Sequence, residues 1–106
     1  MRLFLYGTLL DPARMARFAG RPMPLAPATL PGWKRVAMRG GRYPTLARAR
    51  AIVPGAVAVV GAAALRRLSA YEGPLYDFRR LAVATARGKT VAGVWIARAA
   101  TKRTWP

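Results

Sequence analysis

Cysteine and histidine are both absent from the 106-residue sequence. The first absence excludes disulfide bonds and thiolate nucleophiles. The second excludes a histidine general base, a histidine-liganded metal and a Ser–His–Asp triad. Acid–base chemistry in this chain therefore falls to its carboxylates.

Carboxylates are themselves scarce, because Asp11, Glu72 and Asp77 are the only three in the sequence. They are spread along the chain and do not form the cage of oxygen ligands that a hard cation requires. We therefore expect no metal site and no cofactor.

The scarcity of acidic residues leaves the chain strongly basic, with 19 lysines and arginines and a net charge of +16. Sixteen of the 19 are arginines, and no block of five or six occurs. A GC-rich coding sequence is one explanation, because it tends to give abundant arginine and alanine. A polyanionic partner such as nucleic acid explains it too, with residues 33–35 (Trp-Lys-Arg) as a stacking face, but no nucleic-acid motif accompanies the charge.

Long hydrophobic runs are also missing. The longest, residues 52–65, contains Pro54, Gly55 and Gly61 and cannot span a bilayer, which takes about 20 helical residues. The apolar run before Gly7 is too short for a signal peptide. We expect a cytoplasmic protein without membrane contact, folded as a single domain over residues 1–106.

The pattern of apolar residues and turn residues predicts an α+β fold. Its sheet is expected to be small, mixed and strongly bent, almost a barrel, with two short helices. The apolar and β-branched runs place strands at residues 2–6, 33–38, 51–60, 79–86 and 91–98, the last two joined by a hairpin at 87–90. Residues 21–32 carry four prolines and are expected to be extended or looped, residues 40–41 to form a turn, and residues 43–46 to be extended. The tail from residue 99 shows no pattern.

Capping residues delimit the two helices. Asp11 and Pro12 mark the start of a helix over about residues 12–18, which Gly20 ends. Leucines at spacing three favour a second helix over residues 62–71. Gly73, as a left-handed cap, and the following proline end it.

The segment after the first strand, Tyr6-Gly7-Thr8-Leu9, is the first place where chemistry is expected. A glycine there allows a sharp turn and the close approach of another group. Successive backbone N–H groups in such a turn form a concavity suited to an anion. The alternative is a purely structural turn, which the same residues also favour.

Glu72 is the second place, because it stands at a helix C-terminus between two tyrosines. The negative end of the helix dipole and desolvation by the aromatic rings both raise the pKa of a carboxylate. A general base working near neutral pH requires such a raised pKa. The alternative is a surface glutamate paired with an arginine, although charge balance does not call for a lone glutamate in so basic a chain.

Three short motifs occur in a recognisable order: YGTL at residues 6–9, YPTL at 43–46 and YEG at 71–73, with Gly55 in a strand between the last two. In these elements, over about residues 2–97, the sequence resembles the gamma-glutamylcyclotransferase-like superfamily. The resemblance implies a mixed barrel with a cavity between the YGTL loop and Glu72. It also implies conversion of a gamma-glutamyl peptide or gamma-glutamyl amine to 5-oxoproline and a free amine.

The resemblance implies roles for individual residues. Glu72 would be the general acid/base, and the backbone N–H groups of Gly7, Thr8 and Leu9 would hold substrate oxygens. From the residues themselves, Tyr6, Tyr43 and Tyr76 are expected either to line the substrate cavity or to pack as core or rim aromatics. Arg79 or Arg80 is expected to hold an acidic substrate tail. Two alternatives stay open: a non-catalytic small-molecule-binding domain of the same fold, and a basic nucleic-acid-associated protein.

Overall fold

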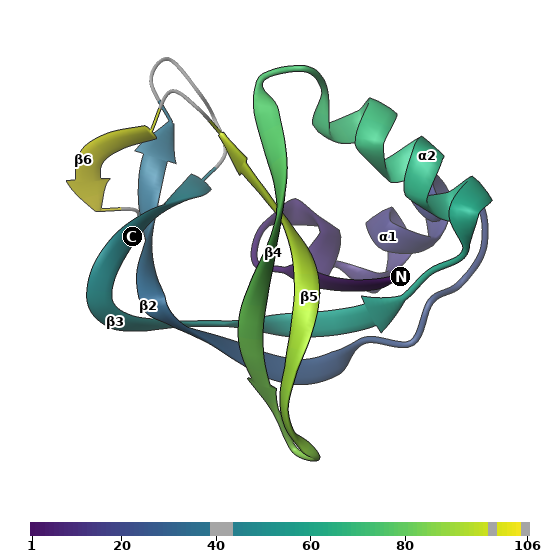
Figure 1. Cartoon of the computed structure of the whole chain (residues 1–106). Coiled ribbons are helices and arrows are strands. Elements are labelled where there is room, and N and C mark those ends of the chain that lie inside the picture. Colours follow the sequence, from purple (N-terminus) through teal and green to yellow (C-terminus); the bar gives the residue numbers. More distant parts are fainter. Residues whose placement is uncertain (39–43, 98–99, 105–106) are drawn as a thin grey trace.

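The computed structural model describes the chain at residues 1–38, 44–97 and 100–104 (Figure 1). Its elements follow one another in the order β1 (Arg2–Leu5), the 3-10 helix η1 (Thr8–Leu10), α1 (Pro12–Ala19), β2 (Ala26–Met38), β3 (Pro44–Val59), α2 (Ala62–Glu72), β4 (Tyr76–Thr85), β5 (Gly88–Ala97) and β6 (Ala100–Thr104). The predicted α+β class is confirmed.

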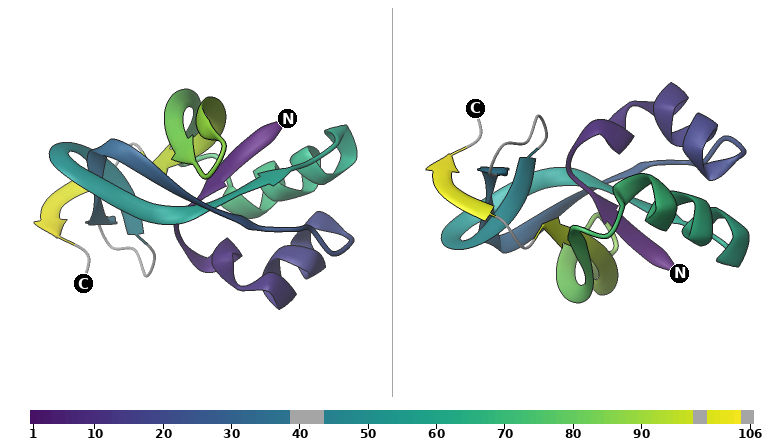
Figure 2. Two further views of the ribbon diagram at one scale, coloured as in Figure 1. Left: turned by 90° about the horizontal axis from the view of Figure 1, so that it is seen from below. Right: turned by 90° about the horizontal axis from the view of Figure 1, so that it is seen from above.

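The strands form one mixed sheet that closes on itself. Its order is β3-β1-β5-β4-β2-β6, and β2 also pairs with β3, so five of the strands complete a circuit. β1 is antiparallel to β3 and parallel to β5. The predicted barrel-like sheet is therefore confirmed, and β6 adds to β2 at the end away from the helices (Figures 1 and 2).

The curvature of the barrel comes mainly from β2 and β3, which run together as two long, bent antiparallel strands (Figure 2). Their register shifts between Pro31 and Trp33, where Gly32 has a φ of 89°. Such a bulge bends a strand and increases its twist. Residues 21–32 were expected to be extended or looped, and from Ala26 onward they are extended as part of β2. The strand accommodates Pro31 because this residue lies at the bulge, where a missing N–H is tolerated.

Other boundaries also move. β3 begins at Pro44 rather than at residue 51, and the tail without a pattern contributes β6. β4 begins at Tyr76 rather than at residue 79 and ends at Thr85. β5 begins at Gly88 rather than at residue 91, so the hairpin turn between them is tighter than expected. The turn expected at residues 40–41 lies outside the described residues.

The two helices pack side by side against the outside of the barrel, at the end of the molecule away from β6 (Figures 1 and 2). Asp11 caps α1 by accepting a hydrogen bond from the Ala13 N–H, and Gly20 ends it in the left-handed conformation, as predicted. Gly73 ends α2 with φ 84° and ψ 179°, which is a positive φ but not the left-handed helical cap that was expected. No helix in the described part of the chain is long and apolar enough to cross a membrane.

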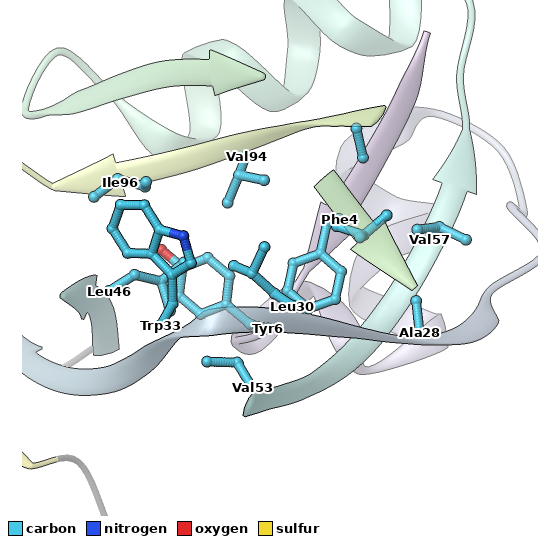
Figure 3. Close-up of a cluster of buried hydrophobic side chains, with 12 residues drawn as sticks. Phe4, Tyr6, Ala28, Leu30, Trp33, Leu46, Val53, Val57, Val94 and Ile96 are labelled. Carbon is cyan, nitrogen blue, oxygen red and sulfur yellow. The ribbon is translucent and has the colours of Figure 1, made fainter. Parts of the chain in front are cut away.

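Buried side chains form one cluster inside the barrel and another beneath the helices. Phe4 and Tyr6 point from β1 and its end into the first cluster, together with Leu30, Trp33 and Val94 (Figure 3). The alternate residues Leu3 and Leu5 belong to the second cluster. Both faces of β1 are therefore buried, as its continuous run of apolar residues predicts.

Gly55 lets β3 approach β1 closely. A Cβ atom on this residue would lie 2.2 Å from the carbonyl oxygen of Leu5 and 2.7 Å from Cζ of Phe4. No side chain fits there without a shift of the β1 backbone. The close approach thus occurs at the end of β1, where Leu5 pairs with Ala56.

Candidate active site

A cavity of about 280 Å³ opens where β1 ends, between η1 and the last turn of α2. It contains six of the seven residues that the sequence predicted for the site, namely Tyr6, Gly7, Thr8, Leu9, Glu72 and Tyr76. The seventh, Tyr43, lies outside the described residues. Its neighbour Pro44 lines the cavity, as do Phe4, Leu5, Tyr71 and Trp95.

The loop after β1 is a tight 3-10 turn. The N–H of Leu10 donates to the carbonyl of Gly7 at 3.0 Å, and the N–H of Asp11 donates to the carbonyl of Thr8 at 3.3 Å. Neither bond uses the N–H of Thr8 or of Leu9, because the first N–H groups of a helix have no acceptor within the helix. The turn thus presents backbone donors at the cavity wall, and Asp11 then caps α1 and fixes the direction of the chain.

The hydroxyl of Tyr6 is held by a buried polar network. It donates to the carbonyl of Trp95 at 2.5 Å and also hydrogen-bonds the side chain of Thr45. Thr45 is fully buried, and its hydroxyl accepts a hydrogen bond from the N–H of Ala97 at 2.7 Å. Burial raises the pKa of Tyr6 far above its usual value, so the phenol stays protonated and remains a donor.

A second hydrogen bond joins the loop to α2. The Oγ1 of Thr8 and the hydroxyl of Tyr71 are 2.8 Å apart. The ring of Tyr71 packs on Phe18 of α1 with a centroid separation of 4.1 Å. Because Tyr71 precedes Glu72 in the last turn of α2, this contact fixes the loop relative to the carboxylate.

Glu72 is the last residue of α2 and is half-buried. The last helical hydrogen bond runs from the N–H of Gly73 to the carbonyl of Ser69 at 3.0 Å, and the helix ends because Gly73 has a φ of 84°. Burial raises the pKa of Glu72 from 4.5 to about 7. Near neutral pH the carboxyl is therefore present in both protonation states, which suits a group that must accept and return a proton.

Two arginines expected near the substrate lie elsewhere. Neither Arg79 nor Arg80 belongs to the described lining of the cavity. The guanidinium of Arg79 lies 5.5 Å from the ring centre of Trp33, and that of Arg48 lies 5.1 Å from it. Trp33 is only 6% exposed, so its ring is not available to stack on a nucleic-acid base as the alternative interpretation required.

Sequence reasoning missed Tyr71 and Trp95 as parts of the site. Tyr71 carried a signal, because it adjoins Glu72 and its hydroxyl needs a partner when buried. Trp95 carried none, because it reaches the cavity only through the pairing of β5 with β1. In the described residues, no three histidine, cysteine or acidic side chains come together as metal ligands would.

The fold resembles several solved structures. The solution structure of an Arabidopsis thaliana protein has a TM-score of 0.83 and 24% identity, covering 99% of this chain and 74% of that one. A second Arabidopsis thaliana solution structure has a TM-score of 0.81 and 27% identity, covering 91% of this chain and 61% of that one. A structure named gamma-glutamyl cyclotransferase has a TM-score of 0.83 and 18% identity, covering 95% of this chain and 68% of that one.

Comparison with curated proteins gives no significant sequence match. The family model described as gamma-glutamyl cyclotransferase, AIG2-like, matches residues 3–105, which is nearly the whole chain. The superfamily that the YGTL, YPTL and YEG motifs indicated is thereby confirmed. The chain belongs to the AIG2-like gamma-glutamyl cyclotransferase family.

Proposed function

We propose that the protein converts a gamma-glutamyl peptide or gamma-glutamyl amine to 5-oxoproline and a free amine. The observation that carries the proposal is Glu72, whose carboxyl lines the cavity with its pKa raised to about 7. The cavity also presents the backbone of the Gly7–Leu9 loop. A base and a set of backbone donors are what an intramolecular attack on an amide requires.

The reaction needs no water and no protein nucleophile. The α-amine of the glutamyl group attacks its own γ-carbonyl, forming a C–N bond and a five-membered ring. The bond from the γ-carbon to the departing nitrogen then breaks. The proton lost by the attacking amine ends on the departing nitrogen, so atoms and charge balance.

Glu72 would carry that proton. Its ionised carboxylate accepts it from the α-amine and its protonated form returns it to the leaving group. A positioned acid–base group contributes a factor of about 10²–10⁴ in rate. A carboxyl whose pKa lies near the working pH serves both directions, because neither form is strongly disfavoured.

The Gly7–Leu9 loop would bind the substrate through its backbone. The N–H groups of Thr8 and Leu9 are not used in the 3-10 turn and are offered to substrate oxygens. Loss of one donor to a developing oxyanion costs about 10²–10³ in rate. Bending the glutamyl chain toward ring closure adds the advantage of proximity.

A panel of gamma-glutamyl amino acids, gamma-glutamyl amines and glutathione, incubated in ¹⁸O-water, tests the proposal. Mass spectrometry should detect unlabelled 5-oxoproline and the free amine. Labelled glutamate would instead indicate hydrolysis and would overturn the cyclisation mechanism.

A non-catalytic binding domain is the alternative, favoured by the presence of the cavity alone. It predicts saturable binding of a gamma-glutamyl compound without any release of amine. Turnover above the spontaneous rate for one member of the panel excludes it.

A further inference from the structure

Phe78 of β4 is a large aromatic residue that is 40% exposed. Its ring is not free, because it packs against Trp95 at a centroid distance of 5.1 Å and an angle of 54°. It also lies directly over Gly93 of β5. A Cβ atom there would be 2.1 Å from Cζ of Phe78, so the absence of a side chain at residue 93 is what lets the ring rest on the strand. The ring is therefore held in place while one side remains open to solvent.

The position of Phe78 connects it to the cavity. Trp95, its partner across the β4–β5 ladder, is buried and lines the cavity. Tyr76, two residues before Phe78, also lines the cavity, and residues two apart on a strand share a face. Tyr76, Trp95 and Phe78 thus form one aromatic surface, here called the aromatic shelf, that leads from inside the cavity to the protein surface.

The size of the cavity limits how much of a substrate it can hold. Its volume of about 280 Å³ lies just below the roughly 300–1,000 Å³ of pockets that enclose drug-sized ligands. A cavity of this size holds a gamma-glutamyl group beside Glu72 and leaves little room for a bulky amine. Such an amine would extend past the lining residue Trp95, on which the ring of Phe78 packs.

We propose that the aromatic shelf binds the leaving group, and that the preferred substrates are gamma-glutamyl conjugates of apolar or aromatic amines. This inference rests on the proposed function and adds the substrate class. Phe78 is the specificity-determining residue: it contacts the part of the substrate that departs and takes no part in the proton transfer. Offset or edge-to-face packing on a fixed ring favours an aromatic group over a methyl group.

Binding to the Glu72→Gln variant tests the inference without turnover. Calorimetry would compare gamma-glutamyl anilide with gamma-glutamyl methylamide, which share every group except the ring. We expect the anilide to bind at least about tenfold more tightly, the usual range for a difference in apolar contact. Adding Phe78→Ala should reduce that ratio to near one while leaving methylamide binding unchanged.

Two further variants make the test specific. Ile52→Ala truncates another exposed apolar side chain, 63% exposed on β3, and should leave the ratio unchanged. Gly93→Ala keeps the Phe78 ring but forces it off the strand, and should reduce the ratio as Phe78→Ala does. Phe78→Leu, which keeps apolar bulk, serves if the alanine variant does not fold.

The outcomes separate the two proposals. An anilide preference of less than about threefold, no binding of the anilide, or a ratio unaffected by both Phe78→Ala and Gly93→Ala would overturn the aromatic shelf. Turnover by Glu72→Gln at the wild-type rate would overturn the role of Glu72, yet the binding ratio would still report on the aromatic shelf. If the preference for the anilide depends on Phe78 but the wild type cyclises neither compound, the aromatic shelf is a binding surface and the proposed reaction is wrong.

Discussion

Replacing Glu72 with glutamine should stabilise the protein at alkaline pH and have little effect at acid pH. Burial raises the pKa of this carboxyl from 4.5 to about 7, so the folded state holds its proton more tightly than the unfolded state does. Stability therefore falls as the pH rises from about 4.5 to 7 and the cost of burying the charge is fully present above that range. Glutamine has nearly the same shape and no charge, so it escapes that cost.

The size of the effect follows from the shift. Each unit of pKa corresponds to 1.36 kcal/mol, so a rise from 4.5 to about 7 gives at most about 3 kcal/mol. Glu72 is only half-buried, and its remaining solvent contact reduces that figure. In a domain of this size one kcal/mol shifts Tm by about 4–8 °C. We expect the variant to melt several degrees above the wild type at pH 8.

Thermal melts of both proteins at 150 mM salt, in steps from about pH 4 to 9, provide the assay. The absence of histidine makes the comparison clean, because no other side chain with an ordinary pKa titrates in the middle of this range. The remaining groups are common to both proteins and cancel in the difference. A gap in Tm that does not change with pH, or a variant less stable than the wild type at pH 8, would show that burying the charge of Glu72 costs no stability.

Three further predictions concern the pH profile, the fold and the loop. The kcat/KM of the wild type should rise through an inflection near pH 7, because Glu72 must be ionised to accept a proton; a flat profile between about pH 6 and 8 would contradict this. Gly55→Ala should lower stability by about 1–3 kcal/mol in urea unfolding, since its Cβ would lie 2.2 Å from the Leu5 carbonyl; an unchanged midpoint would show that β1 shifts freely. Tyr71→Phe should lower kcat while changing stability by only about 1 kcal/mol, because the ring packing remains and the hydrogen bond to Thr8 is lost; an unchanged kcat would remove Tyr71 from the account.

The parts of the site that the sequence predicted are those set by local structure. The strand end at Gly7 and the helix end at Glu72 follow from short-range signals, a glycine after an apolar run and a Gly-Pro pair after a helical pattern. The order of these motifs also placed the chain in its superfamily. The cap at Asp11 and the stop at Gly20 were predictable for the same reason.

What the sequence did not predict depends on contacts between distant segments. The strand β2 passes through Pro27 and Pro31 because β3 supplies its partner along most of its length, and propensity alone cannot foresee that pairing. Trp95 reaches the cavity only because β5 lies between β1 and β4. Arg79 or Arg80 was expected at the substrate, but neither lines the described cavity. Arg79 packs over Trp33 instead, and that contact depends on which aromatic ring the folded chain brings near it.

The pKa of Glu72 is raised as expected, but the expectation rested on two causes. The sequence suggested both the helix dipole and desolvation by the neighbouring tyrosines. In the folded protein burial is the cause of the raised pKa. Burial is a property of the assembled cavity, to which β1, η1 and β5 all contribute.

The most direct test of the central claim is the rate of 5-oxoproline release from the best substrate by three proteins: the wild type, Glu72→Gln and Asp77→Asn. The last variant removes a nearby carboxylate that does not line the described cavity and so controls for the loss of one negative charge. We expect the rate to fall by about 10²–10⁴ in Glu72→Gln and to be nearly unchanged in Asp77→Asn. A Glu72→Gln variant that is folded and releases 5-oxoproline at the wild-type rate would contradict this expectation.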